Sequence, residues 1–235
     1  MSAAAVIVAG GRGERLGSPK QFLPLGGLPM LLWSVRSFEA HPGVSEIVVV
    51  LPAEAAAEPP PWLKGESVRC CAGGDTRRAS AGLGVLSVDS NADWILIHDA
   101  ARPFLTSGVI DRVLAAASDV GAALPVLPVS DTIKRVEGGR VVDTPDRSRL
   151  GRAQTPQAFE AGLIRHLHAM AAEKGISASD DVALCESEGH PVAAVEGDPW
   201  NLKITTPADL ALAEWLVTSG RVSVPRSGSE TGDPL

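Results

Sequence analysis

The sequence predicts an α/β fold, with one domain built on a mixed, mostly parallel sheet that helices flank. Three observations carry this prediction. Short apolar runs alternate along the chain with segments of helical periodicity. The early runs are apolar at every position, as strands are when helices cover both faces of a sheet. The length of 235 residues and the 45% share of hydrophobic residues suit one domain with a substantial core.

Each apolar run is expected to be a strand and each gap a helix. The expected strands are residues 4–9, 46–51, 68–72, 94–97, 122–129, 192–195 and 202–204. The expected helices are residues 30–40, 76–88, 109–118, 159–173 and 181–188, followed by a last helix that runs to Leu216. That last helix has a clear start, because Thr206 can cap it and Pro207 suits its first position. Gly82 and Gly84 lower the helix propensity of residues 76–88.

Residues 133–143 (IKRVEGGRVVD) interrupt this alternation. A Gly-Gly pair between two short extended runs predicts a β-hairpin. An isolated hairpin is only marginally stable. We therefore expect an arm over residues 131–147 that packs on a second copy of the chain, with packing on its own domain as the alternative. The domain is expected to span residues 1–216, and the polar residues 217–235 to form a flexible tail.

Composition limits the partners and the compartment. The net charge of −7 argues against a nucleic-acid partner but not against a small anionic substrate. Cys70, Cys71 and Cys185 are odd in number and show no C-x-x-C spacing, so we expect reduced thiols in a cytoplasmic protein. No run of about 18 apolar residues occurs, so no membrane span is expected. No basic residue precedes the apolar N-terminal run, which argues against a signal peptide.

A glycine-rich loop, AGGRGERLGSPKQ, follows the first expected strand at residues 9–21. Its backbone can approach a phosphate closely, and Arg15 and Lys20 are among the cations that it adds. A dinucleotide-binding loop is disfavoured because Pro19 interrupts any helix and no acid ends the second strand. A Walker loop is excluded because no register provides its G-x-x-x-x-G-K-[ST] pattern. A nucleotidyltransferase loop fits, with glycines followed by Arg and then Pro-Lys; a purely structural loop is the weaker alternative.

Other charged residues lie beside expected strand ends. In HDAARP, Asp99 could bind Mg²⁺ and Arg102 a phosphate, or the two could pair with each other, while His98 is expected to be structural. In the second glycine-rich turn, AGGDTRRAS, Asp75 could cap a helix or contact a nucleoside. Lys203 lies in a short apolar segment, where it is either an edge residue whose charge reaches solvent or a functional cation.

The order of AGGRGERLGSPKQ, GGDTRRAS, HDAARP, DTIK, DR, TPQ and NLKITTPADL resembles that of the 2-C-methyl-D-erythritol 4-phosphate cytidylyltransferases. The resemblance runs from Ala4 to Leu216 and implies a Rossmann-like, glycosyltransferase-A-like fold. It implies an enzyme that transfers CMP from CTP to 2-C-methyl-D-erythritol 4-phosphate, in isoprenoid precursor synthesis, with Mg²⁺ as the divalent cation. A ribitol-5-phosphate cytidylyltransferase and, from another class, a non-catalytic nucleotide-binding regulator are the alternatives.

The resemblance also implies a role for each matching residue. The implied catalytic residues are Arg15, Lys20, Arg147 and Lys203. The implied contacts to CTP are Ala9, Gly10, Gly11, Gly13, Gly74, Asp75, Ser80, Asp99 and Arg102. The implied contacts to the sugar-alcohol phosphate are Thr132, Arg147, Thr155, Ser179 and Lys203. Asp99 would also bind the metal. In a homodimer, Thr132 and Arg147 would come from the partner subunit, because the arm would reach across to it.

Overall fold

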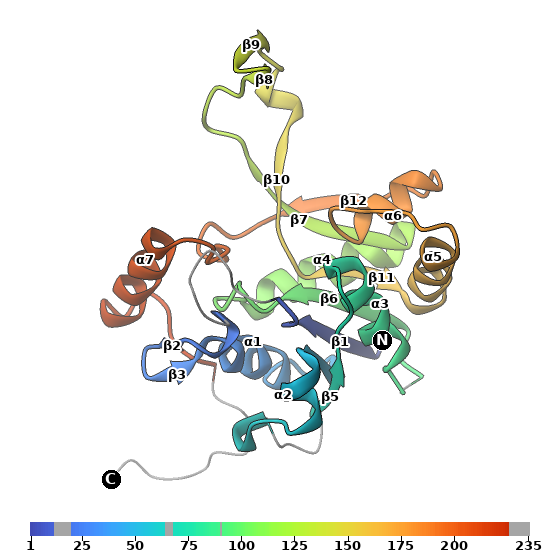
Figure 1. The fold of residues 1–235 in the computed structure, drawn as a ribbon, viewed down its shortest axis with the longest axis vertical. Helices are drawn as coiled ribbons and strands as arrows, with labels where there is room; N and C mark the ends of the chain where they lie inside the picture. Colours follow the sequence, from blue (N-terminus) through green and yellow to red (C-terminus); the bar gives the residue numbers. More distant parts are fainter. Residues whose placement is uncertain (12–19, 64–67, 90, 226–235) are drawn as a thin grey trace.

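An eight-stranded sheet forms the centre of the protein in a computed structural model that describes residues 1–11, 20–63, 68–89 and 91–225. The strand order is β10-β7-β11-β6-β1-β4-β5, and β12 pairs with β7. The strands are β1 (Ala3–Val8), β4 (Val44–Leu51), β5 (Val68–Ala72), β6 (Trp94–Asp99), β7 (Ala122–Pro128), β10 (Gly151–Ala153), β11 (Gln157–Glu160) and β12 (Ala193–Glu196). Only β10 and β11 pair antiparallel with their neighbours, which confirms the predicted mixed, mostly parallel sheet (Figure 1).

Helices cover both faces of this sheet. One face carries α1 (Met30–Glu39), the short α2 (Ala53–Ala57) and α4 (Ser107–Val120), and the other carries α3 (Arg77–Leu86), α5 (Ala161–Glu173) and α6 (Val182–Ser187). Successive residues of β1 point to opposite faces, so Ile7 packs in the first core cluster and Val6 in the second. Both faces are buried, which explains why the strand is apolar throughout. No helix in the described ranges is long and apolar enough to cross a membrane.

The two glycines of α3 lie where the helix packs most closely. A Cβ on Gly84 would lie 2.4 Å from Val6 Cγ1 and 2.6 Å from Val50 Cγ2. A Cβ on Gly82 would lie 3.1 Å from His168 Nδ1. Packing against β1, β4 and α5 therefore outweighs the low helix propensity of these two residues.

The last helix, α7 (Pro207–Thr218), begins as predicted. The Thr206 side chain accepts from Asp209 N, and the Asp209 carboxylate accepts from Thr206 N, which together form a capping box. The helix packs in a small third cluster with two short strands, β2 (Pro24–Leu25) and β3 (Leu28–Pro29). Val222 and Val224 pack against the same cluster, so no break follows Leu216. Residues 226–235 of the expected tail lie outside the described residues.

Two expected elements were wrong. Residues 202–204 form an irregular segment and not a strand, so Lys203 is not an edge-strand residue. The expected helix 159–173 begins only at Ala161, because Phe159 belongs to β11 and pairs with Ile95 and Ala122. The antiparallel strands β10 and β11 were not expected, since three or four residues are too few to show a period-2 pattern.

The predicted hairpin is confirmed and forms an arm, residues 131–147, that projects from the domain (Figure 1). Strands β8 (Arg135–Glu137) and β9 (Arg140–Asp143) meet at Gly138 and Gly139, whose φ angles of 56° and 76° favour glycine. Every residue of the two strands is exposed. A 3₁₀ helix, η4 (Arg147–Arg149), follows β9 in the sequence and lies close to the hairpin at the far end of the arm (Figure 1).

Candidate functional site

The site lies where the carboxyl ends of β1, β5 and β6 meet, beside two glycine-rich segments. Val8, at the end of β1, is paired with Asp99 at the end of β6. The backbone then continues through Ala9, whose N–H donates to Val50 O at 2.8 Å, to Gly10. This edge of an open parallel sheet is where ligands bind in such folds.

Ser80 fixes the second glycine-rich segment and lies close to the first. Its hydroxyl accepts from Gly74 N at 3.1 Å and donates to Gly74 O at 3.2 Å. A Cβ on Gly10 would lie 3.3 Å from Ser80 Oγ, and one on Gly73 would lie 2.8 Å from it. The glycines therefore permit a close approach that a side chain would block. This arrangement leaves backbone groups of both segments next to one another.

Thr76, and not Asp75, caps helix α3. The Thr76 side chain accepts from Ala79 N at 3.0 Å, while Asp75 is exposed in the turn before it. The capping role that the sequence offered for Asp75 is therefore wrong. Its carboxylate remains exposed next to Gly74.

Asp99 is the centre of the site. Its N–H donates to Thr155 Oγ1 at 3.1 Å. Its Oδ1 accepts from Arg77 Nε at 3.1 Å, and its Oδ2 accepts from Lys203 Nζ at 2.7 Å. Burial alone would raise the pKa of Asp99, but the charges of Arg77 and Lys203 outweigh it and hold the pKa well below its usual range. Asp99 is therefore ionised at neutral pH.

A hydrogen-bond chain behind Asp99 explains His98. The His98 Nε2–H donates to Arg102 O at 3.0 Å, and His98 Nδ1 lies 3.0 Å from Thr155 Oγ1, in position to accept its proton. Burial lowers the pKa of His98 to about 4. A neutral, fully buried imidazole is a structural histidine, as expected. The hydroxyl of Thr155, which we expected to bind substrate, is used here to hold Asp99 and His98.

Three polar side chains fix the loop that carries Lys203. Gln154 Nε2 donates to Asp198 O at 2.8 Å and to Asn201 O at 3.1 Å, and Asn201 Nδ2 donates to Thr155 O at 2.8 Å. Arg102 Nη1 donates to Asn201 O at 2.9 Å. The expected phosphate ligand Arg102 thus braces this loop in the structure. The sequence did not mark Gln154 or Asn201 as site residues, although Gln154 directly precedes the TPQ motif and Asn201 begins the NLKITTPADL motif.

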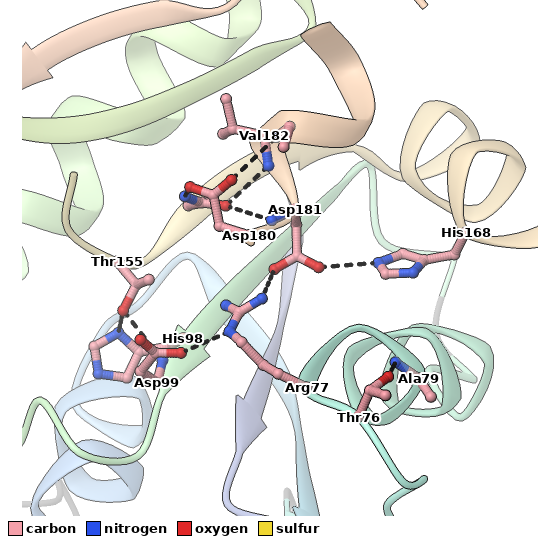
Figure 2. Close-up of polar contacts among 12 residues, drawn as sticks. Thr76, Arg77, Ala79, His98, Asp99, Thr155, His168, Asp180, Asp181 and Val182 are labelled. Carbon is pink, nitrogen blue, oxygen red and sulfur yellow. Dashed lines mark hydrogen bonds and ion pairs between the residues drawn. The ribbon is translucent and has the colours of Figure 1, made fainter. Parts of the chain in front are cut away.

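Behind the site, Arg77 connects Asp99 to a buried carboxylate that the sequence analysis did not select. Arg77 Nη1 donates to Asp181 Oδ2 at 2.7 Å, and His168 Nε2 lies 3.2 Å from Asp181 Oδ1 (Figure 2). Burial alone would lower the pKa of Arg77, but Asp181 and Asp99 raise it above its ordinary value. We call Lys203, Asp99, Arg77, Asp181 and His168 the Asp99 network.

Other expected site residues lie elsewhere. Thr132 and Arg147 belong to the arm, which projects away from the sheet edge that carries Asp99 (Figure 1). Ser179 is exposed in the bend before α6. Gly13 and Arg15 lie outside the described residues, and so does the side chain of Lys20, which begins the 3₁₀ helix Lys20–Phe22.

The donor chemistry of the site suits a metal ion that the substrate helps to bind. Within the described ranges, no group of three His, Cys, Asp or Glu residues gathers around a common point. Asp99 is an ionised carboxylate at the sheet edge. Mg²⁺ is commonly held by one or two carboxylates together with substrate phosphates and water. The residues present therefore fit Mg²⁺ bound with a nucleotide, and not a metal cage made by the protein alone.

Comparisons with known proteins agree with this geometry. The family model of 2-C-methyl-D-erythritol 4-phosphate cytidylyltransferase matches residues 3–219. The enzyme of that name from Syntrophotalea carbinolica is 42% identical over an alignment of 224 residues, which covers 91% of this chain and 95% of the relative. The crystal structure of that enzyme from Thermus thermophilus superposes with a TM-score of 0.78 at 40% identity, covering 91% of this chain and 98% of the other. The structure of 4-diphosphocytidyl-2C-methyl-D-erythritol synthase from Anaerococcus prevotii superposes with a TM-score of 0.82 at 26% identity, covering 92% and 96%. The chain therefore belongs to the 2-C-methyl-D-erythritol 4-phosphate cytidylyltransferase family.

Proposed function

We propose that this site transfers CMP from CTP to 2-C-methyl-D-erythritol 4-phosphate, giving 4-diphosphocytidyl-2-C-methyl-D-erythritol and pyrophosphate. The observation that carries the proposal is the cation pair Arg77 and Lys203 on the Asp99 carboxylate, next to the two glycine-rich segments. Membership of the family favours this acceptor over ribitol 5-phosphate and an enzyme over a nucleotide-binding regulator.

The reaction needs charge compensation more than proton transfer. An oxygen of the acceptor phosphate attacks the α-phosphorus of CTP, a new P–O bond forms, and the bond to the pyrophosphate leaving group breaks. The attacking oxygen is already anionic at neutral pH, so no strong base is required. The neutral, internally bonded His98 agrees with this requirement. The obstacle is repulsion between two polyanions, which cations must offset.

Several residues supply the contacts that this chemistry needs. Ala9, Gly10, Gly11 and Gly13 would present backbone groups to the triphosphate, and Gly74, Asp75 and Ser80 would contact the nucleoside. Arg15 and Lys20 would stabilise the charge that develops at the α-phosphorus, with Arg as a fork and Lys as a point charge. Lys203 would leave Asp99 and bind the acceptor phosphate. Ser179 and Thr155 would also contact this substrate, as the resemblance to the family implies.

Mg²⁺ is the divalent cation that we propose for this site, with Asp99 as its protein ligand. When bound, it neutralises charge on the triphosphate. Both Asp99 oxygens already accept from cations in the structure. Each carboxylate oxygen has a second lone pair, so Asp99 can bind the metal while it keeps its bond to Arg77.

We propose that the enzyme is a homodimer in which the arm completes the partner's site. Val136, Val141 and Val142 of the arm are 58%, 62% and 54% exposed. Because a two-stranded hairpin is only marginally stable by itself, this exposed apolar surface favours a partner that covers it. Arg147 and Thr132 lie on this arm and not beside Asp99. A symmetric dimer would cover the valines and deliver both residues to the other subunit.

The thiols support a cytoplasmic location. Cys70, Cys71 and Cys185 are all free, which is their usual state in a reducing compartment. Burial raises the pKa of Cys185 to about 11, so this thiol is a poor nucleophile.

Pyrophosphate release by the purified protein with CTP and Mg²⁺ tests the function. The acceptors to compare are 2-C-methyl-D-erythritol 4-phosphate and ribitol 5-phosphate. Release with the first acceptor and not the second is the expected result. Release with the second alone would keep the CTP chemistry but reject the proposed acceptor, and release with neither would reject the activity.

A further inference from the structure

The Asp99 network is a row of polar contacts that begins at Lys203 and ends at His168, and Figure 2 shows its part from Asp99 through Arg77 and Asp181 to His168. Lys203 Nζ lies 2.7 Å from Asp99, Arg77 joins Asp99 to Asp181 at 3.1 Å and 2.7 Å, and His168 ends the row 3.2 Å from Asp181. The five residues come from the loop before α7, the end of β6, the start of α3, the N-terminus of α6 and α5. No single segment could build such a row, so the fold itself has to assemble it.

The two ends of the row differ in burial, although the change along the row is not uniform. The exposed fraction of the side chain is 39% at Lys203, 11% at Asp99, 26% at Arg77, 1% at Asp181 and 3% at His168. A buried ion pair is weak evidence for a stabilising role, because apolar residues of similar volume often stabilise as well or better. The site lies at the open end of the row, which favours a role in function.

The planar guanidinium of Arg77 makes the two carboxylates dependent on each other. Its Nε donates to Asp99 and its Nη1 to Asp181, so two different edges of one rigid group are occupied. The bond to Asp181 therefore holds the guanidinium of Arg77 in one plane. A guanidinium held in that plane keeps Oδ1 of Asp99 in one position. If Lys203 turns to the acceptor phosphate, as the proposed function requires, Arg77 is the side chain that still orients Asp99.

Asp181 is itself rigidly held. Gln157 Oε1 accepts from the backbone N–H groups of Asp181 and Val182, both at 3.1 Å. Gln157 Nε2 donates to Asp180 Oδ2 at 2.8 Å. On the other side, Gly82 leaves the space in which His168 reaches Asp181. Among the described residues, Arg77 is the side chain that bonds to both Asp181 and Asp99.

We propose that Asp181 is a positioning residue, which acts through Arg77 to hold the Asp99 carboxylate in its working orientation during nucleotidyl transfer. The proposal rests on the proposed function, since it concerns the same site. It assigns to Arg77 and Asp181 an effect on the rate of the chemical step and not on the affinity for CTP. It also predicts that the effect of Asp181 disappears when Asp99 no longer carries a charge.

A double-mutant cycle between Asp181→Asn and Asp99→Asn tests this dependence, with kcat and both KM values measured for every variant. Asp181→Asn alone is expected to lower kcat about 10-fold and to change the KM for CTP by less than about 2-fold. In the Asp99→Asn background the same change should lower kcat by less than about 2-fold, because interacting residues are not additive. Asp111→Asn is the control, since Asp111 also contacts a buried histidine, His41 at 3.1 Å, but lies on α4, which covers the other face of the sheet.

Arg77→Lys keeps the test decisive if Asp181→Asn fails to fold. A lysine keeps the charge but cannot donate in two directions from one plane, so kcat should again fall about 10-fold. Equal losses of kcat in both Asp99 backgrounds, or a loss confined to the KM for CTP, would overturn the proposal. In those cases the wild-type enzyme would still be active. An inactive wild-type protein would instead overturn the proposed function, and the positioning role with it.

Discussion

The Asp99 network and the arm are opposite in construction, although both belong to the proposed site. In the network, Asp99 and Arg77 pair with charged residues of the same chain, and only 1% of the Asp181 side chain is exposed. In the arm, every residue of β8 and β9 is exposed, and the two strands project from the domain (Figure 1). The difference agrees with the proposed dimer, in which one subunit would hold the Asp99 network and the arm of the other subunit would complete the site.

The largest expected effect comes from the first glycine-rich loop. Lys20→Ala or Arg15→Ala should lower kcat by at least about 100-fold, as for loss of a charge contact made in the transition state. Steady-state kinetics with circular dichroism will separate this from unfolding. Lys174→Ala, which removes a surface charge 3.8 Å from Glu188, is the control. A near-normal kcat in either variant would remove that residue from the mechanism.

A smaller effect, confined to one substrate, is expected from the arm. Arg147→Ala should raise the KM for the sugar-alcohol phosphate about 10-fold and leave the KM for CTP nearly unchanged, because one charged hydrogen bond to a phosphate is lost. Arg149→Ala is matched, since both arginines lie exposed in η4. An increase in the KM for CTP in the Arg147 variant would show that the arm contacts the other substrate.

The arm should also set the oligomeric state. Val141→Asp places a charge on the apolar surface of the arm and should weaken the dimer at least about 10-fold, as measured by analytical ultracentrifugation. Leu86→Asp changes an equally exposed apolar residue, 70% exposed on α3, and should have no such effect. Equal dissociation constants for Val141→Asp and the wild-type protein would mean that this surface is not the interface.

The smallest effect on activity is expected from a change in packing inside the fold, which should act on stability. Gly84→Ala should lower the free energy of unfolding by about 1–3 kcal/mol, because a Cβ there would overlap Val6 and Val50. Chemical denaturation measures it. Gly108→Ala is the matched helical control, since its Cβ would meet nothing closer than Arg112 Nη1 at 3.5 Å. Similar stability of both variants would show that α3 can move away from the sheet at little cost.

The sequence was most informative where the physical signal is local. The buried parallel strands were predicted because each is a continuous apolar run, and the hairpin because Gly138 and Gly139 allow the positive φ angles of its turn. The start of α7 was predicted for the same reason, since Thr206 and Pro207 act within one turn. These elements need no knowledge of the rest of the chain.

The sequence was least informative where distant residues meet. Arg77 and Asp181 are 104 positions apart, and no local pattern marks either as a partner of the other. For Lys203 the sequence left an edge residue and a functional cation as alternatives, because its apolar neighbours resemble a strand; in the structure its loop is fixed by Gln154 and Asn201. Only the folded sheet brings these side chains together.

Subunit complementation is the most direct test of whether the arm acts in the site of the partner subunit. Lys20→Ala and Arg147→Ala chains, each nearly inactive at low acceptor concentration, are refolded together in equal amounts. If the arm acts on the partner, about half of the dimers are mixed and each mixed dimer has one intact site, so activity should recover to about a quarter of the wild-type value. No recovery above the sum of the two separate variants would contradict this account, because it would place Arg147 in the site of its own subunit.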